Sequence, residues 1–273
     1  MNKDMNQPPP RKNRPPLAYM NGDFLKGPDS RSLRILSEYL EPQSHFRKQR
    51  IRDTIVFFGS ARITEDGPLG RYYKEARILA EKLTTWVKKT FRERTYRYVI
   101  CSGGGPGIME AANRGAADAR GKTIGLNIGL PFEQFPNPWI TNELNFEFHY
   151  FFMRKFWFAY LAKALVVFPG GFGTMDELFE ILTLVQTRKL TKKITIVLYG
   201  SAFWKEVLNF DALVKHGTIS PADLELFQFA DSPDEALKIL QSRLVVQPEI
   251  ATEELPAISH TAKPNEPLPD GEW

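Results

Sequence analysis

Ala-Leu-Val-Val-Phe-Pro-Gly-Gly-Phe-Gly-Thr-Met-Asp-Glu, residues 164–177, joins an apolar run to a glycine-rich turn and the start of a helix. A short continuous apolar run is typical of a strand that is buried on both faces of a parallel sheet. The same succession follows residues 54–58 and 98–101, where apolar runs end in Gly-Ser and in Ser-Gly-Gly-Gly. A strand, a glycine loop and a helix in that order indicate parallel strands joined by helical crossovers.

The alternation extends through most of the chain. It predicts strands at residues 54–58, 98–101, 123–127, 164–168, 194–198 and 226–229. It predicts helices at residues 71–89, 107–119, 151–162 and 175–189, and another that begins at Ser232 and Pro233. The predicted fold is α/β: a Rossmann-like, doubly wound parallel sheet with flanking helices in a single domain. In such sheets a ligand binds at the carboxyl ends of the strands, so the loops that leave each strand carry the functional residues.

Composition divides the chain into a core and two tails. Residues 1–30 are rich in proline and charge and are predicted to be disordered. Residues 31–50 carry Leu33, Leu36 and Leu40 at helical spacing and predict a helix packed on the core domain, residues 51–246. Residues 247–273 are again rich in Pro and Glu and predict a second disordered tail.

Several classes of protein fit the composition poorly. A formal net charge of +4, from 36 basic and 32 acidic residues, is too small to indicate nucleic-acid binding. Cys101 is the single cysteine, so an intrachain disulfide is impossible and a reducing, cytoplasmic compartment is expected. The N-terminus lacks the apolar region of a signal peptide. The most apolar segment, residues 150–172, contains Arg154, Lys155 and Lys163, which argues against a membrane span.

The first two glycine loops are suited to an anion. Ser60 follows the first strand in a Gly-Ser pair, and Gly103, Gly104 and Gly105 precede a helix that begins after Pro106. Glycines allow the backbone to approach a ligand closely, and a helix N-terminus offers unpaired N–H donors to a phosphate. Neither the dinucleotide spacing nor the Walker A Lys-Ser/Thr pair is present. Close packing of the strand against the helix would also require glycines here. The residues alone therefore leave both interpretations open, a phosphate site and a purely structural turn.

The third loop, residues 169–177, allows two interpretations. Gly171, Gly173 and Thr174 supply backbone N–H groups and a hydroxyl that would cradle a phosphate monoester. Alternatively, Thr174 and Glu177 form a capping box in which each side chain bonds the other residue's backbone N–H. Spacing alone gives the two equal weight.

A cationic pair interrupts the aromatic helix predicted at residues 151–162. Arg154 and Lys155 lie among Phe151, Phe156 and Phe158, which predict a largely buried helix. Because a buried cation is costly without a partner, an anionic ligand or a carboxylate is expected near Arg154.

Three strings in this order resemble the LONELY GUY (LOG) family: Gly-Gly-Gly-Pro-Gly-Ile-Met-Glu at 103–110, Met-Arg-Lys at 153–155 and Pro-Gly-Gly-Phe-Gly-Thr-x-x-Glu at 169–177. The resemblance covers residues 54–198, and the longer motifs are similar to the larger bacterial branch. It implies a Rossmann-like phosphoribohydrolase that releases a free base and ribose 5-phosphate from a nucleoside 5′-monophosphate such as AMP or a cytokinin nucleotide. It further implies that no cofactor or metal is needed, and that the protein is a homodimer or larger homo-oligomer.

The resemblance assigns roles residue by residue. The family's catalytic glutamate falls on Glu177 and its arginine on Arg154. The substrate-binding positions, together with those from the first two glycine loops, are Glu133, Lys155, Gly171, Phe172, Gly173, Thr174, Met175, Asp176, Thr183, Ser60, Gly103, Gly104 and Gly105. The chain has a few inserted residues near Glu133 and carries Asp176 where plant members have glutamate, so the identity of the base stays open.

The hypothesis for the chemistry is a glycosidic hydrolysis. Positive charge grows on the ribose in an oxocarbenium-like transition state, and Glu177 would stabilise it and orient the attacking water. Arg154 would hold Glu177 and keep its carboxylate ionised. The four histidines have no metal-ligand spacing.

Other classes remain as alternatives. A non-catalytic carrier of nucleotides or of molybdenum cofactor would use the same glycine loops. An NAD-dependent oxidoreductase fits poorly, because the first loop lacks the dinucleotide glycines. In a third alternative, an assembly or regulatory protein, the tails would carry the function. Lysine decarboxylation, a label often given to the family, normally needs pyridoxal phosphate on a Schiff-base lysine, and the sequence marks no such lysine.

Overall fold

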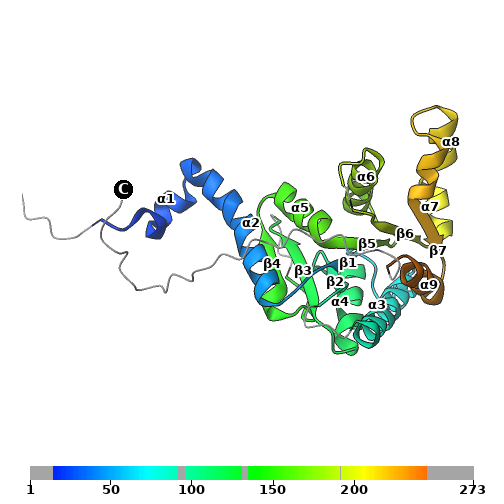
Figure 1. Cartoon of the computed structure of the whole chain (residues 1–273), viewed down its shortest axis with the longest axis horizontal. Helices are drawn as coiled ribbons and strands as arrows, with labels where there is room; N and C mark the ends of the chain where they lie inside the picture. The colour runs from blue at the N-terminus through cyan, green and yellow to red at the C-terminus, as the bar shows by residue number, and fades with distance from the viewer. Residues whose placement is uncertain (1–14, 92–95, 131–134, 191, 245–273) are drawn as a thin grey trace, which may run out of the picture.

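The computed structural model describes residues 15–91, 96–130, 135–190 and 192–244 (Figure 1). Within these residues a seven-stranded sheet has the order β4-β3-β2-β1-β5-β6-β7, with every neighbouring pair parallel. The strands are β1 Thr54–Phe58, β2 Val99–Ser102, β3 Thr123–Ile128, β4 Asn145–Phe148, β5 Ala162–Val167, β6 Thr195–Tyr199 and β7 Phe227–Ala230. The predicted doubly wound α/β fold is confirmed. The strand order reverses between β1 and β5, so the crevice above these two strands is the expected ligand site.

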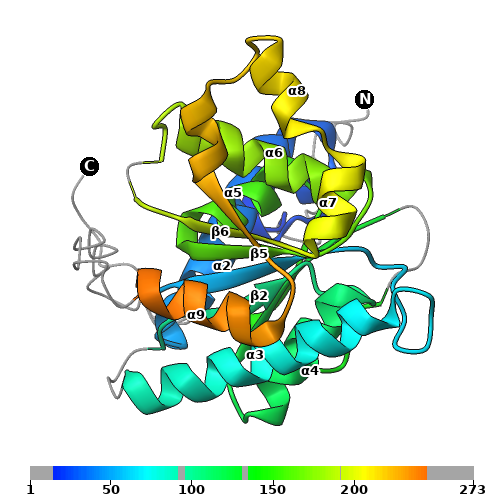
Figure 2. The ribbon, with the colours of Figure 1, turned by 90° about the vertical axis from the view of Figure 1, so that its right-hand side faces the viewer.

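Helices cover both faces of the sheet. The α-helices are α1 Gly22–Lys26, α2 Arg31–Lys48, α3 Gly70–Thr90, α4 Ile108–Asp118, α5 Phe151–Leu161, α6 Phe172–Gln186, α7 Ser201–Val207, α8 Phe210–Lys215 and α9 Pro233–Leu244. Helices α3, α4 and α9 lie on one face, and α2, α5, α6 and α7 on the other (Figure 2). Strand β1 is buried along its whole length. Its Ile55 and Phe57 pack in the core under α3, α4 and α9, whereas Val56 and Phe58 pack in the core on the opposite face.

Strand β4 is absent from the strands predicted from the sequence. Its residues, Asn-Phe-Glu-Phe, alternate exposed and buried at the edge of the sheet. Such a strand lacks the continuous apolar run that marks the inner strands. Helices α7 and α8 were not predicted either, because they are short and have little periodicity.

The predicted N-terminal tail is shorter than expected. Residues 15–30 contain the 3-10 helices Ala18–Met20 and Pro28–Ser30 as well as α1, and the predicted helix at 31–50 is α2. Asn21 caps α1 by accepting from the Phe24 N–H, and the Ser30 hydroxyl donates to the Leu25 and Gly27 carbonyls. These side chains satisfy backbone groups that a disordered tail would leave to water, which is why this segment has defined structure. Residues 1–14 and 245–273, the rest of both predicted tails, lie outside the described residues.

No helix among the described residues combines the length and the apolar content that crossing a membrane requires. Two further 3-10 helices, Asn142–Leu144 and Pro221–Leu226, complete the secondary structure of these residues.

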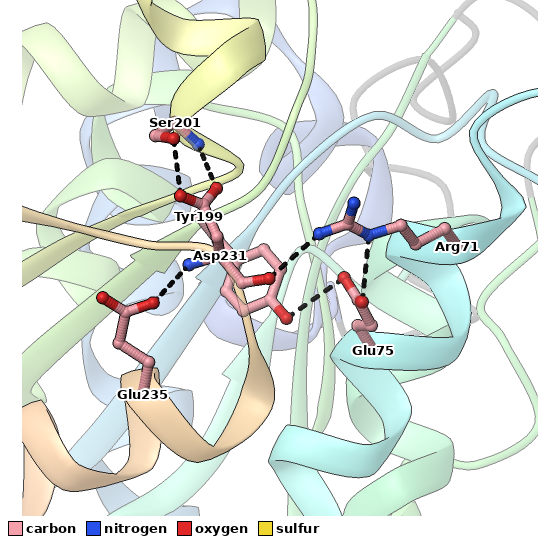
Figure 3. Close-up of polar contacts among 6 residues, drawn as sticks. All are labelled: Arg71, Glu75, Tyr199, Ser201, Asp231 and Glu235. Carbon is pink, nitrogen blue, oxygen red and sulfur yellow. Dashed lines mark hydrogen bonds and ion pairs between the residues drawn. The ribbon is translucent and has the colours of Figure 1, made fainter.

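A polar cluster fastens the ends of β6 and β7 to α3 (Figure 3). The Tyr199 hydroxyl donates to Glu75, which also accepts from the Arg71 guanidinium. Arg71 donates to the Asp231 carbonyl, and the Asp231 carboxylate accepts from both the N–H and the hydroxyl of Ser201 at the start of α7. The cluster therefore fixes the side chain of Tyr199 at the carboxyl end of β6.

Tyr199 supports the two loops above β1 and β5. Its ring stacks on Phe168 with centroids 4.3 Å apart, and Phe168 stacks in turn on Phe57 at 6.0 Å. Phe168 directly precedes the loop that begins at Pro169, and the Ser60 N–H donates to the Pro169 carbonyl at 3.0 Å. The loop after β1 is thus hydrogen-bonded to the loop after β5, and both loops follow strand ends that pack on the stacked rings of Phe57, Phe168 and Tyr199.

Candidate functional site

A cavity of about 690 Å³ lies at the carboxyl ends of β1, β2, β3 and β5. It is the position expected for a ligand in a doubly wound sheet. Its lining combines the loop after β1, the start of α4, the end of β3, one side of α5 and the first two turns of α6. The lining residues are Phe58, Gly59, Ser60, Ala61, Arg62, Gly103, Met109, Asn127, Ile128, Leu130, Phe151, Arg154, Phe158, Gly171, Phe172, Gly173, Thr174, Met175 and Glu177.

Arg154 of α5 and Glu177 of α6 meet in this cavity. Arg154 Nη2 lies 3.3 Å from Glu177 Oε1, and the two side chains are 14% and 7% exposed. The guanidinium also lies over the rings of Phe151 and Phe158. Arg154 Nε is buried and has no hydrogen-bond acceptor within the described part of the chain. Because a buried N–H without a partner is costly, this atom indicates a place for a ligand acceptor.

Burial raises the pKa of Glu177 to about 7, although the positive charges of Arg154 and Lys155 act to lower it. Burial likewise lowers the pKa of Arg154 from its ordinary value, against the attraction of Glu177. Arg154 thus favours the ionised carboxylate, as predicted, but it does not offset the whole effect of burial, so Glu177 is only partly ionised near neutral pH. Desolvation of this buried carboxylate outweighs the attraction of the two cations, so Glu177 titrates in the physiological range.

The capping-box interpretation of Thr174 and Glu177 is also wrong. Helix α6 begins at Phe172 with Gly171 as its N-cap residue, and no side chain caps it. Glu177 therefore lies in the second turn, where its carboxylate faces Arg154 instead of the helix end. The first N–H groups of an α-helix have no acceptor inside the helix, so the amides at the start of α6 are available to an anion.

The structure brings most of the predicted site residues together. Ser60, Gly103, Arg154, residues 171–175 and Glu177 line the cavity. Five others lie outside the lining: Gly104, Gly105, Lys155, Asp176 and Thr183. Lys155 forms ion pairs of 2.7 Å with both Asp176 and Glu180, and the Thr183 hydroxyl donates to the Phe179 carbonyl. Glu133 lies outside the described residues. The substrate-binding roles of all these residues stay predictions.

Several lining residues are not among those predicted from the sequence. Asn127 is the last residue of the predicted third strand. A polar residue at the carboxyl end of a buried strand is a signal that could have identified it. Met109, Ile128 and Leu130 are ordinary apolar residues with no local pattern that separates them from the core. Within the described residues, no group of three or more His, Cys, Asp or Glu side chains is arranged to hold a metal ion.

Comparison with known proteins points to the LOG family. The family model described as "possible lysine decarboxylase" matches residues 109–240, which include Arg154 and Glu177. The cytokinin riboside 5′-monophosphate phosphoribohydrolase LOG2 of Arabidopsis thaliana is 28% identical over 198 residues, 71% of this chain and 84% of that protein. LOG3 of the same plant is 27% identical over 158 residues, 56% of this chain and 71% of that protein. The chain is thus similar to LOG-family proteins over 56% to 71% of its length.

Other similarities of this chain are more distant. The probable phosphoribohydrolase LOGL3 of rice (Oryza sativa subsp. japonica) is 25% identical over 78% of this chain and 94% of that protein. The molybdenum cofactor carrier protein of Chlamydomonas reinhardtii is 20% identical in solved structure, covering 71% of this chain and 99% of that one with a TM-score of 0.47. At family level the named relatives are phosphoribohydrolases. Membership of the larger bacterial branch stays a prediction.

Proposed function

We propose that this protein, like the LOG proteins it resembles, hydrolyses the N-glycosidic bond of a nucleoside 5′-monophosphate and releases the free base and ribose 5-phosphate. The observation that carries the proposal is the buried Arg154–Glu177 pair in a cavity that also receives the start of α6. One end of the cavity thus offers donors to an anion, and its centre offers a carboxylate to a developing positive charge. A nucleoside 5′-monophosphate matches this arrangement: its phosphate would bind the donors, and its glycosidic carbon C1′ would lie next to the carboxylate.

The phosphate end is formed by the α6 N-terminus. The N–H groups of Gly173 and its neighbours and the hydroxyl of Thr174 are suited to the phosphate oxygens, and the dipole of the 15-residue helix favours negative charge there. Ser60 and the exposed Arg62 lie at the same cavity and would supply a hydroxyl and a cation. The phosphate would anchor the substrate and so orient its ribose over the Arg154–Glu177 pair.

In the proposed reaction, water adds to C1′ as the bond from C1′ to the base nitrogen breaks with both electrons going to the base. Ionised Glu177 stabilises the oxocarbenium-like ribose and accepts the proton of the attacking water, which then passes to the departing base. Arg154 orients Glu177 through Nη2, and its unpaired Nε would donate to a ribose hydroxyl.

Much of the cavity lining is apolar. Met109, Ile128, Leu130 and Phe151 contribute to this wall, and Phe172, at the start of α6, is 93% exposed. Such a wall suits the face of a purine and an apolar substituent on the base. It supports cytokinin-type nucleotides and AMP as the substrates to test, in line with the names of the curated relatives.

The chemistry of Lys155 does not support lysine decarboxylation. Burial would lower the pKa of Lys155, but its hydrogen bonds to Asp176 and Glu180 hold that pKa above the ordinary value. A Schiff base with pyridoxal phosphate forms from a neutral amine, and an ammonium group held by two carboxylates is poorly suited to that role.

The test is to incubate the purified protein with a panel of nucleoside 5′-monophosphates that includes AMP and isopentenyladenosine 5′-monophosphate, and to measure the free base by chromatography. Release of base together with an equal amount of ribose 5-phosphate is the expected result. Adenosine without its phosphate is expected to react at least about 100 times more slowly, because the anchor is missing. Tight nucleotide binding without release of any base would favour a carrier instead.

The rate is expected to rise with pH through about 7. Glu177 acts as a base only when it is ionised, and burial raises its pKa to about 7, so the active form accumulates as the pH increases from 6 to 8. The measurement is kcat/KM across this range, since that ratio reports groups of the free enzyme. A flat profile, or one that falls over this range, would contradict the assigned role of Glu177.

An apolar surface on α2 and α5 supports a second proposal, a homodimer. A groove of about 520 Å³ is lined by Ser32, Ile35, Leu36, Tyr39, Phe152, Met153 and Phe156, none of them charged. Leu36 and Phe152 are 48% and 50% exposed, and α1 with the start of α2 extends away from the domain (Figure 1). Because the groove and the exposed leucines of α2 lie on one face, two copies related by a twofold axis can cover each other.

Leu36→Glu is expected to convert the dimer to a monomer, because it would bury two charges at the interface. Light scattering during gel filtration should give twice the 31.3 kDa of one chain for the wild type and one chain mass for the variant. Leu213→Glu is the matched control, since Leu213 of α8 is 37% exposed and lies outside this groove. A wild type that elutes as a monomer would refute the proposal.

A further inference from the structure

The glycine loop that follows β2 is held from below by a buried network of polar side chains. Ser102, Asn113, Asn137 and Thr123 are 0%, 0%, 7% and 1% exposed, respectively. They come from the end of β2, the middle of α4, the connection that precedes β4, and the start of β3. Burial of a polar group costs free energy unless the group is hydrogen-bonded. The bonds that these four side chains form therefore show which part of the backbone they hold in place.

Asn137 is the centre of this network. Its Nδ2 donates to the Gly104 carbonyl at 3.0 Å, to the Gly105 carbonyl at 3.1 Å and to Asn113 Oδ1 at 2.9 Å. Its backbone N–H also donates to the Gly104 carbonyl, at 2.7 Å. Its Oδ1 accepts from the Trp139 N–H, which fixes which way the amide faces. Asn137 thus binds the carbonyls of two consecutive loop residues, Gly104 and Gly105, which precede it in the sequence by 33 and 32 positions.

Asn113 and Ser102 complete the support. Asn113 Oδ1 accepts from the Ser102 hydroxyl at 2.7 Å, and its Nδ2 donates to Thr123 Oγ1 and to the Ile124 carbonyl. Ser102 Oγ in turn accepts from the Gly104 N–H at 3.1 Å. Both polar atoms of the Gly104 backbone are therefore bound to the network.

The loop conformation that results is one that only glycine adopts easily. Gly104 has φ of +74°, and a Cβ at this position would come within contact of the Asn127 side chain, which lines the cavity. Because C=O and N–H point in opposite directions across a trans peptide, binding of the Gly104 carbonyl to Asn137 turns the Gly105 N–H away from Asn137. Gly103, which directly precedes Gly104, lines the cavity itself.

We propose that Asn137, with Asn113 and Ser102, is a positioning residue that holds the glycine loop so that its backbone at Gly103, the loop residue that lines the cavity, meets an oxygen of the bound phosphoribosyl group. The proposal rests on the proposed function for the nature of the ligand. Asn137 does not touch the substrate, and it acts by binding the carbonyl side of the Gly104–Gly105 peptide. The loop then meets the ligand without the cost of being ordered on binding.

The test compares Asn137→Ala with Thr141→Val. Thr141 lies in the same connection and its Oγ1 accepts from the Thr123 N–H, so the control removes one hydrogen bond there without touching the glycine loop. Asn137→Ala is expected to weaken AMP and ribose 5-phosphate binding, measured by calorimetry, about tenfold. Thr141→Val is expected to stay within about twofold of the wild type. Adenine, which lacks the phosphoribosyl group, should bind equally to all three proteins.

The kinetic readout separates positioning from general loss of structure. For Asn137→Ala we expect KM for AMP to rise about tenfold while kcat changes less than about threefold. Ser102→Ala, which leaves Asn137 in place but removes the acceptor for the Gly104 N–H, should weaken AMP binding in the same direction and serves if Asn137→Ala does not fold. Unchanged AMP affinity in a folded Asn137→Ala or Ser102→Ala protein, or an equal loss in Thr141→Val, would overturn the proposal. A wild type that binds AMP but releases no base would refute the proposed function alone, because the binding comparison does not need turnover.

Discussion

Glu177→Gln is expected to lower kcat for nucleoside 5′-monophosphate hydrolysis at least about 1000-fold while AMP affinity stays within about threefold. Glutamine has the same shape and its Oε1 can still accept from Arg154, so the cavity and the phosphate end remain intact. It has no negative charge to place against the oxocarbenium-like ribose, and its amide cannot accept the proton of water. Single-turnover base release gives the rate, and calorimetry with AMP gives the affinity.

Glu180→Gln is the matched control for this result. Glu180 lies in the same helix, one turn after Glu177, and pairs with Lys155 at 2.7 Å, outside the lining of the cavity. Removing this charge should change kcat less than about threefold, because Glu180 does not line the cavity and Lys155 keeps its second ion pair, with Asp176. If Glu177→Gln retained a tenth of wild-type turnover, or if both variants lost activity equally, Glu177 would not be the catalytic carboxylate.

Much of the fold follows from the sequence because the inner strands are buried on both faces. Strands such as β1 and β5 read as continuous apolar runs, and each ends in glycines that mark the loop above it. Strand β4 could not be predicted in the same way, since only Phe146 and Phe148 face the core, whereas Asn145 and Glu147 are exposed. The short structure in residues 15–30 depends on hydrogen bonds from Ser30 and Arg34 back to carbonyls in this segment, which composition does not reveal.

Most residues of the candidate site could be predicted from the sequence, but the pKa of its carboxylate could not. The spacing of Thr174 and Glu177 is equally that of a capping box, and only the position of Gly171 as N-cap residue decides against it. The pKa of Glu177 depends on how tightly α5 packs over α6, which is a tertiary property. Asn137 carries no local signal at all, because an asparagine in a connection is ordinary until the fold brings it under a loop more than 30 positions away.

The same carboxylate that is proposed to give activity is expected to cost stability. The pKa of Glu177 rises from its ordinary 4.5 in the unfolded chain to about 7 in the folded protein. The folded state therefore binds a proton between these two pH values that the unfolded state has already released, and stability falls as the pH increases through this window. Above pH 7 the full cost is reached, about 3 kcal/mol.

Glu177→Gln is accordingly expected to raise the free energy of unfolding by about 2–3 kcal/mol at pH 8.5 and by close to nothing at pH 4, where the wild-type carboxyl is protonated in both states. Urea denaturation of both proteins at the two pH values measures the difference. Glu180→Gln, which gives up an ion pair with Lys155, should instead lose up to about 1 kcal/mol at pH 8.5. A gain for Glu177→Gln that is equal at pH 4 and pH 8.5 would point to better packing of the amide, and a loss at pH 8.5 would mean that Arg154 stabilises the charged carboxylate by more than its burial costs.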